Sequence, residues 1–346
     1  MMKTVLLTGG AGFFGGLLKD RLLDAGYSCV SLDLHRDTTV HPNLVSIQGD
    51  IRDQALLDRI FSEHSFDAVL HIAAILAHGD IDDKFLWTSN VDGTRNLAEM
   101  AKKYRVPRVI FTSSNCLWGE GVAHAIKEDE TPKPVEVYGK SKLEGEKILQ
   151  QYAGDFHSII IRCPTIIDCG RLGLLSILFE FIHDHKKVWV VGSGANRYQF
   201  IYAGDLADAC IRAIDYDRSD IFHIGSDNVK SLRAIYDYVI QCAKSRSKVA
   251  SLPKGPTLLG MRLAHVLRVS PLGPYHYKMI AENFTFDTSK IKRQLNWRPT
   301  LTNEEMLWRA YQYFATNRQE IENRKDVSAH KQGAKMGVIR VLKWMS

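Results

Sequence analysis

The sequence predicts an α/β fold: a doubly wound parallel sheet with a smaller, mainly helical C-terminal lobe. Three observations support this expectation. Short apolar runs alternate with amphipathic helical patterns through the first half of the chain. A glycine-rich turn follows the first apolar run, and the regular alternation ends after Pro164. Such a fold binds ligands at the carboxyl ends of its strands.

The elements of the first half follow from this alternation. The short apolar runs expected to form strands are residues 4–8, 29–33, 45–48, 68–72, 109–113 and 159–163. The segments expected to form helices carry apolar residues at helical spacing with charges opposite, and they are residues 15–25, 54–64, 91–104 and 139–152. Because strands and helices alternate, the strands should lie parallel.

The second half is less regular. It predicts helices over 174–184 and 203–214, a strand over 187–191, and one more strand of the main sheet over 222–225. We therefore divide the chain into a sheet domain, 1–164 plus about 196–226, and a lobe of about 165–195 plus 227–315. A basic amphipathic tail, 316–346, follows.

Composition is that of a soluble enzyme with a sizeable core: 346 residues, of which 45% are hydrophobic and 24% charged. The six cysteines form no Cys-x-x-Cys pair, so we expect reduced thiols, a cytoplasmic protein and no metal site. The N-terminus leaves no room for a signal peptide. The net charge of +6 lies mostly in the tail, and the body has no basic stripe, which disfavours nucleic acid as a partner.

The turn at residues 8–15, Thr-Gly-Gly-Ala-Gly-Phe-Phe-Gly, follows a strand and opens a helix. Glycines let the backbone approach a pyrophosphate, and the helix N-terminus offers free N–H groups, so we interpret the sheet domain as a dinucleotide-binding Rossmann domain. Asp33 ends the second strand, where a carboxylate can bind ribose hydroxyls, and this favours NAD. His35 and Arg36 leave NADP open. A tight turn without a ligand is the structural alternative.

Two further positions suit a cofactor. Asp50 is a candidate for contact with the adenine amino group, and a helix N-cap is the alternative. Ala73 and Ala74 are small residues after a strand, where a cofactor can approach closely. His71, just before them, is interpreted as a buried core histidine.

Ser114, Tyr138 and Lys142 form the candidate catalytic set. A phenol has a pKa near 10, so a tyrosine that acts as a base needs positive charge beside it. Tyr138 and Lys142 stand four residues apart in a helical segment and therefore share one face. Ser114 follows a strand, and its hydroxyl can bond the substrate oxygen whose proton Tyr138 handles. The set indicates hydride-transfer chemistry, with an ordinary amphipathic helix surface as the alternative.

With these motifs the chain resembles the extended short-chain dehydrogenase/reductase superfamily, also called NAD-dependent epimerases/dehydratases, over about residues 3–315. The matching motifs include residues 8–15, 50–51, 71–74, 90–94, 112–114, 138–142, 162–164, 286–290 and 295–299. The resemblance implies a homodimer and assigns Ser114, Tyr138 and Lys142 to catalysis. The cofactor-binding residues that it implies are Gly9, Gly12, Phe13, Phe14, Gly15, Asp33, Asp50, Ile51, Ala73, Ala74, Asn90, Tyr138, Lys142 and Pro164.

Departures from the family pattern narrow the expected chemistry. Sugar-nucleotide dehydratases usually carry an Asp-Glu pair after the catalytic hydroxyl, whereas this chain has Asn115 and Cys116, followed by Leu117 and Trp118. Elimination and decarboxylation are therefore disfavoured. Ser114, Asn115 and Arg197 are the implied substrate-binding residues. Arg197 resembles an arginine that holds a diphosphate, with a structural ion pair to Asp205 or another acid as the alternative.

The leading hypothesis is an epimerase that acts on a nucleotide sugar through a transient ketone, with NAD as cofactor. The alternatives are a dehydrogenase or reductase of a sugar-nucleotide ketone or of a hydrophobic alcohol, because the segment near Arg197 is somewhat like the 3β-hydroxysteroid dehydrogenase branch. The apolar run 172–179 lines a greasy pocket or is core. A non-catalytic dinucleotide-sensing module is a third hypothesis. The tail either rests on an anionic membrane or docks on protein.

Overall fold

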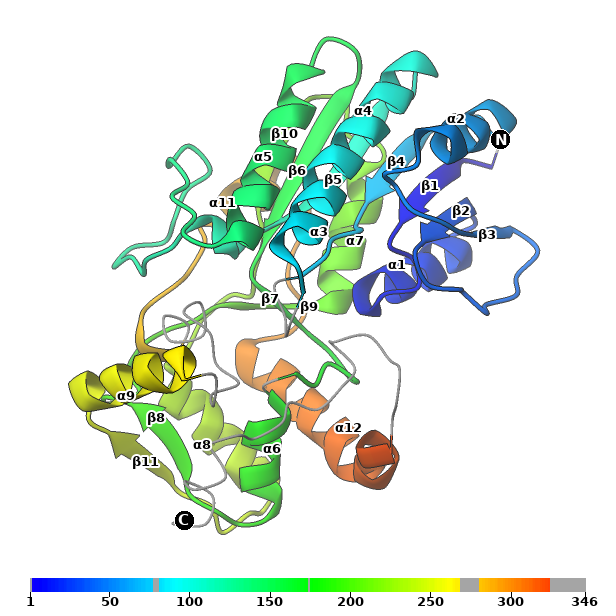
Figure 1. Ribbon diagram of the computed structural model, residues 1–346. Coiled ribbons are helices and arrows are strands. Elements are labelled where there is room, and N and C mark those ends of the chain that lie inside the picture. Colours follow the sequence, from blue (N-terminus) through cyan, green and yellow to red (C-terminus); the bar gives the residue numbers. More distant parts are fainter. Residues whose placement is uncertain (1, 77–80, 174, 268–279, 324–346) are drawn as a thin grey trace.

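A single seven-stranded sheet organises the larger part of the chain (Figure 1). The computed structural model describes residues 2–76, 81–173, 175–267 and 280–323. The sheet has the order β10-β6-β5-β4-β1-β2-β3, and every pair in it is parallel. Its strands are β1 (Thr4–Thr8), β2 (Ser28–Asp33), β3 (Leu44–Gln48), β4 (Ala68–His71), β5 (Arg108–Ser114), β6 (His157–Cys163) and β10 (Asp220–His223). The predicted doubly wound fold is confirmed.

Helices cover both faces of this sheet, as Figure 1 shows. One face carries α1 (Phe13–Asp24), α7 (Ala203–Ala213) and α11 (Ser289–Gln294), and the other carries α2 (Gln54–Glu63), α4 (Gly93–Lys103) and α5 (Val137–Gln151). Strand β1 shows why both faces are needed: Val5 and Leu7 pack on the α1 side and Leu6 on the α4 side. All three are fully buried, which explains the continuous apolar run of this strand.

The order of the strands reverses at β1, which lies between β2 and β4. Such a switch point opens a crevice outside the carboxyl ends of the strands, where a ligand can enter. The glycine turn after β1 and the segment after β4 both lie at this point.

The helix predicted over 91–104 begins at Gly93, two residues later than expected. A short helix, α3 (Asp83–Trp87), leads into a π-helical turn, η1 (Thr88–Asp92), and only then into α4. The wider turn accommodates an extra residue and holds Asn90, one of the implied cofactor-binding residues. π-Helical turns of this kind occur frequently at functional sites.

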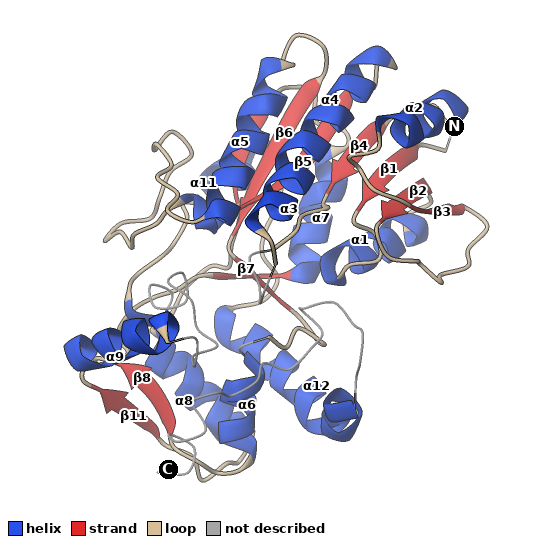
Figure 2. Cartoon of the chain, in the orientation of Figure 1, coloured by secondary structure: helices blue, strands red, loops and turns tan. Residues whose placement is uncertain are grey.

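The remaining elements build a lobe with its own apolar core (Figure 2). They are α6 (Leu175–His183), α8 (Leu232–Cys242), α9 (Lys254–Val266), α12 (Asn303–Asn323) and a parallel pair formed by β8 (Val188–Val191) and β11 (Val249–Leu252). Another parallel pair, β7 (Thr165–Ile167) with β9 (Phe200–Tyr202), lies between lobe and sheet. Leu172, Ile177 and Phe179 are buried in the lobe core, so this part of the apolar run is core.

The domain boundaries stay our prediction, and the end of the tail, 324–346, lies outside the described residues. No helix in the described part of the chain has the length and apolar character that crossing a bilayer requires.

A buried ion pair joins α5 to β6. The Arg162 guanidinium donates to the Glu146 carboxylate at 2.7 Å, and the two side chains are only 4% and 2% exposed. Arg162 also donates to the Glu128 carbonyl oxygen at 3.3 Å and lies 5.3 Å from the ring centroid of Trp118. The pair therefore holds the helix that carries Tyr138 and Lys142 against the sheet.

We predict that Glu146→Ala lowers the free energy of unfolding by about 3–5 kcal/mol, because it leaves the buried Arg162 charge without a counter-ion. Asp208→Ala is the control: it breaks an ion pair with Arg212 in which both side chains are 41% exposed, and should cost less than about 1 kcal/mol. Chemical denaturation of both variants measures the difference. Equal losses would contradict the structural role of the buried pair.

Candidate active site

The glycine turn after β1 is packed too tightly for side chains. Gly9 has a φ of +83°, and a Cβ atom on it would lie 2.8 Å from the backbone nitrogen of Ala73. A Cβ on Gly15 would lie 2.0 Å from the Gly9 carbonyl oxygen. Gly12, the N-cap of α1, has no side chain that could cap the first-turn N–H groups. The turn therefore presents bare backbone and a helix N-terminus, the arrangement that suits a pyrophosphate.

Asp33 lies beside this turn. Its carboxylate accepts a hydrogen bond from the Ala11 backbone N–H at 3.0 Å and another from that of His35 at 2.9 Å. The strand end and the glycine turn thus hold one carboxylate at the position where ribose hydroxyls would bind. The side chains of His35 and Arg36 are exposed.

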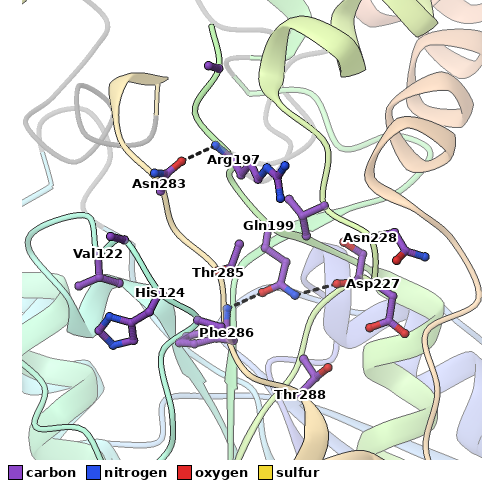
Figure 3. Close-up of a pocket in the computed structure, with 15 residues that line it drawn as sticks. Val122, His124, Arg197, Gln199, Asp227, Asn228, Asn283, Thr285, Phe286 and Thr288 are labelled. Carbon is purple, nitrogen blue, oxygen red and sulfur yellow. Dashed lines mark hydrogen bonds between the residues drawn. The ribbon is translucent and has the colours of Figure 1, made fainter.

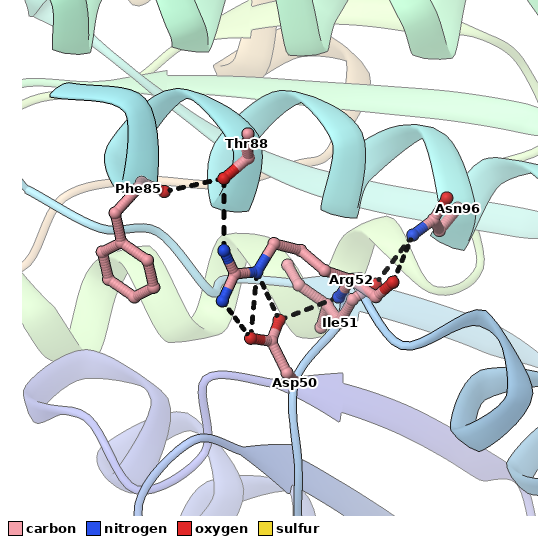
Figure 4. Close-up of polar contacts among 6 residues, drawn as sticks. All are labelled: Asp50, Ile51, Arg52, Phe85, Thr88 and Asn96. Carbon is pink, nitrogen blue, oxygen red and sulfur yellow. Dashed lines mark hydrogen bonds and ion pairs between the residues drawn. The ribbon is translucent and has the colours of Figure 1, made fainter. Parts of the chain in front are cut away.

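Asp50 is bound by Arg52, a partner that the sequence did not indicate (Figure 4). The Arg52 guanidinium donates hydrogen bonds to the Asp50 carboxylate, the shortest of 2.6 Å, and the Arg52 backbone N–H donates another of 2.8 Å. The guanidinium also donates to Thr88 and lies 4.7 Å from the ring centroid of Phe85. Burial works to raise the pKa of Asp50, but the bonds from Arg52 outweigh it and lower that pKa. The N-cap alternative is wrong, because Asp53 caps α2.

Contact between Asp50 and adenine stays a prediction. Ile51, next in the chain, is 9% exposed and packs against Gly93 at the start of α4: a Cβ on that glycine would lie 2.5 Å from Ile51 Cδ1.

His71 is a core histidine in a chain of hydrogen bonds. The Thr94 hydroxyl donates its only proton to the Asn90 carbonyl oxygen at 2.6 Å, so the Thr94 oxygen accepts from His71 Nε2 at 2.9 Å. His71 Nδ1 then accepts from the Thr8 hydroxyl at 2.8 Å, and Thr8 accepts from the Ala73 N–H at 3.3 Å. Burial, helped by the nearby Lys142 charge, lowers the pKa of His71 to about 3, so the ring is neutral.

Asn90 connects this chain to the helix of the candidate catalytic residues. Its side-chain amide exchanges two hydrogen bonds with the backbone of Ile75, at 2.7 and 2.9 Å, and donates to the Ser141 hydroxyl at 3.0 Å. Ser141 in turn donates to the Tyr138 carbonyl oxygen at 2.8 Å. Asn90 therefore fixes the segment after β4 relative to the first turns of α5.

The structure brings Ser114, Tyr138 and Lys142 together at the carboxyl end of β5. Ser114 is the last residue of β5, and Tyr138 and Lys142 lie on α5, which packs against that strand. The Ser114 side chain acts on the Tyr138 phenol and works to lower its pKa, and the Lys142 ammonium lies 4.1 Å from the ring centroid of Phe111 on β5. The three residues therefore lie at the strand ends, where the fold binds ligands.

Burial perturbs both ionisable members of this set. It raises the pKa of the Tyr138 phenol, against the lowering effects of the Ser114 hydrogen bond and of Arg171. It also lowers the pKa of Lys142 to about 8, although Cys163 and Glu146 act in the opposite direction. The phenol therefore holds its proton at neutral pH, and a base of this kind requires additional positive charge beside it.

Asn115 is held by a residue that sequence reasoning missed. Its Nδ2 donates to the Tyr198 hydroxyl at 2.5 Å, and its Oδ1 lies 3.5 Å from Ser114 Oγ. Asn115 and Tyr198 are 3% and 2% exposed, and the Tyr198 ring packs against Phe284. Tyr198 therefore supports the segment of Ser114 from the side of the lobe. Its place beside Arg197 was the only signal for it in the sequence.

The Arg197 side chain lies on the other side of this segment from Tyr198, because neighbours on an extended segment point to opposite sides. It lines a polar cavity of about 510 Å³ with His124, Gln199, Asn228 and Thr288 among others (Figure 3). The Arg197 backbone N–H donates to Asn283 Oδ1 at 2.8 Å. Asp205, its suggested ion partner, accepts hydrogen bonds from Thr300 instead.

Four other predicted residues lie at the start of α1 or after the strands β4 and β6. Phe14 is buried in the core under α1, whereas the partly buried ring of Phe13 lies 5.9 Å from the Arg171 guanidinium. Pro164 follows Cys163, which pairs with Ser114 in the sheet, so it borders the catalytic set. Ala74 is partly buried in the segment that Asn90 holds. In the described residues there is no cluster of three or more His, Cys, Asp or Glu side chains suited to a metal ion.

Comparisons with known proteins agree with this geometry. Residues 5–225 match the model of the NAD dependent epimerase/dehydratase family. An uncharacterized protein of Sinorhizobium fredii is 33% identical over 344 residues, which cover 99% of this chain and 86% of that protein. A UDP-glucose 4-epimerase of Yersinia pestis is 37% identical over 347 residues, which cover 87% of this chain and 94% of that protein.

Solved structures share the fold. The crystal structure of a UDP-glucose 4-epimerase from Thermotoga maritima, with UDP-glucose, matches with a TM-score of 0.74 at 23% identity. The match covers 91% of this chain and 99% of that one.

Gly15→Ala should weaken NAD binding by at least about tenfold, because its Cβ would collide with the Gly9 carbonyl oxygen and displace the turn. Gly16→Ala is a matched control one residue along α1, since its Cβ would meet the Gly10 carbonyl oxygen at an ordinary 3.6 Å. Titration calorimetry with NAD measures both. Equal affinities would show that the turn does not hold the cofactor.

Lys142→Met should raise the free energy of unfolding at pH 7. The fall in the Lys142 pKa from 10.5 to about 8 corresponds to roughly 3 kcal/mol of destabilisation by the buried charge, an upper value because methionine loses the contact with Phe111. The gain should shrink as pH rises from about 8 toward 10.5, where the folded protein has released the proton that the unfolded chain still holds. Lys140→Met, at an exposed position of the same helix, should show no such trend. A difference that is independent of pH would contradict this prediction.

Proposed function

The chain belongs to the NAD-dependent epimerase/dehydratase family, and from this premise we propose that it is an NAD-dependent epimerase of a nucleotide sugar that works through a transient ketone. The observation that carries the proposal is the meeting of Ser114, Tyr138 and Lys142 at the strand ends beside the glycine turn. The likeness to the UDP-glucose 4-epimerase of Yersinia pestis supports the substrate class.

NAD suits the residues present. The glycine turn leaves bare backbone for a pyrophosphate, and Asp33 offers a carboxylate where a 2′-phosphate would be repelled. Bound NAD would supply the reversible acceptor for the hydride of the sugar carbon. The remaining steps belong to the side chains of the protein.

Those steps are proton transfers and orientation. Tyr138 takes the proton of the sugar hydroxyl as the carbonyl forms, and gives it back when the alcohol is restored. Ser114 bonds the same oxygen and orients it toward the phenol. Lys142, largely charged at pH 7 with a pKa of about 8, supplies positive charge that stabilises the phenolate. Ser114 and Lys142 are buried and Tyr138 is partly buried, which limits the access of water to the oxygen that changes its protonation state.

The neighbours of Ser114 support epimerisation over elimination. Loss of water from a sugar needs an acid and a base beyond the tyrosine, and Asn115 and Cys116 provide no carboxylate there. The Asn115 amide is moreover bonded to Tyr198, which holds it in place. A bound ketone that meets no further acid or base does not lose water, and its reduction on the opposite face gives the epimer.

Arg197 is the residue that we propose for the diphosphate of the nucleotide. A diphosphate contact by Arg197 would lie in the cavity of Figure 3, on the other side of its segment from Tyr198. A homodimer and a cytoplasmic location stay predictions.

Tyr138→Phe should lower the interconversion of UDP-glucose and UDP-galactose by roughly 100- to 10,000-fold, because the phenol carries the proton. NAD affinity should change little, since the ring remains. Tyr152→Phe, at the far end of α5, is the control and should keep normal turnover. Wild-type turnover in Tyr138→Phe would refute the assigned role.

Two outcomes would select another function. Reduced nicotinamide that accumulates in proportion to product would indicate a dehydrogenase or reductase, because an epimerase regenerates its cofactor in each cycle. Retained NAD in native mass spectrometry, with turnover of neither sugar nucleotides nor hydrophobic alcohols, would favour the dinucleotide-sensing module.

A further inference from the structure

Charge is unevenly distributed along the chain. Between Asp237 and Glu282 the sequence contains seven Lys or Arg residues and no acid. The formal charge of this run, residues 238–281, is therefore +7. It exceeds the net charge of +6 of the whole chain, so the rest of the chain carries a net negative charge. Five cations of the run lie in described segments: Lys244, Arg246, Lys248, Lys254 and Arg262. Outside the basic C-terminal tail, the positive charge is therefore concentrated in one part of the lobe, around β11 and α9.

Helix α9 lies within this run and exposes a stripe of leucines. Leu259, Leu263 and Leu267 are 60%, 56% and 70% exposed. They are spaced four residues apart, and the Leu267 N–H bonds the Leu263 carbonyl oxygen at 3.0 Å, which continues the helical turn. Side chains at this spacing share one helix face. We call these three residues the leucine ridge.

The position of α9 leaves the ridge accessible. The helix lies at the periphery of the lobe, away from the main sheet (Figure 1). Arg262 precedes Leu263 and lies about 100° around the helix from it, on the flank of the ridge. Lys254 begins the helix. An apolar stripe with cations at its flank and end is the pattern of a helix that lies in the surface of a membrane.

We propose that the leucine ridge docks the protein on an anionic phospholipid membrane. The leucines enter the boundary between headgroups and acyl chains, and the α9 cations Lys254 and Arg262 interact with the negative headgroups. The inference is independent of the proposed catalytic function, because it concerns a different part of the chain and needs no substrate.

Charge also argues against another copy of this chain as the occupant. If two copies met through this face, each would bring Lys254 and Arg262 against those of its partner, and like charges across an interface disfavour association. An anionic bilayer offers the complementary charge.

Co-sedimentation of the full-length protein with vesicles tests the proposal. We expect binding to vesicles of equal parts phosphatidylcholine and phosphatidylglycerol, little binding to phosphatidylcholine alone, and release by high salt. Leu259→Ser with Leu263→Ser and Leu267→Ser should lower the partition coefficient at least tenfold. Lys254→Gln and Arg262→Gln should each lower it by about fivefold.

The matched control carries Val40→Ser, Val45→Ser and Val135→Ser, three exposed apolar positions outside α9 that are 96%, 45% and 52% exposed. It should bind vesicles as the wild type does. Thermal unfolding and sedimentation velocity of every variant separate a loss of membrane contact from misfolding or a change of oligomeric state.

Several results would overturn the proposal. One is a wild type that binds neither vesicle, or both equally. Another is a ridge variant that binds normally while Trp344→Ser does not, which would assign membrane contact to the C-terminal tail. A ridge variant that changes the sedimentation coefficient without any vesicle binding would show that the ridge joins copies of the chain.

Discussion

The buried hydrogen-bond chain from Thr8 through His71 and Thr94 to Asn90 is the constraint on which the candidate active site depends. It joins the end of β1, the end of β4 and the π-helical turn η1, and Asn90 extends it to α5 through Ser141. Every polar atom in it has a partner, so that a neutral histidine can be buried completely at the centre. The glycine turn and the catalytic helix consequently have one relative position.

That position has an electrostatic cost. Burial raises the pKa of Tyr138 and lowers the pKa of Lys142. It therefore disfavours the phenolate and the ammonium, the two charged forms that the proposed chemistry requires. The Glu146–Arg162 pair lies one turn further along α5 and keeps the helix against β6. The Glu146–Arg162 pair thus stabilises α5 next to Tyr138 and Lys142, whose burial destabilises it. Such an arrangement is common where function and stability conflict.

The sheet domain and the lobe contribute different chemical groups to the molecule. The sheet domain supplies backbone N–H groups, one carboxylate and the proton-transferring side chains at its strand ends. The lobe contributes Tyr198, which supports Asn115 from outside the sheet, and carries the leucine ridge on α9.

The sequence by itself determined the layered fold, the strands of the first half within about two residues, and the local constellation of glycine turn, Ser114, Tyr138 and Lys142. These depend on periodicity and on spacing along one helix or one turn, which sequence records directly. Only the tertiary structure decided which distant groups meet: Arg52 on Asp50, Tyr198 rather than Arg197 on Asn115, and the histidine chain. Which side of an extended segment faces a neighbour is set by packing between segments far apart in the chain, and a single residue of register changes it.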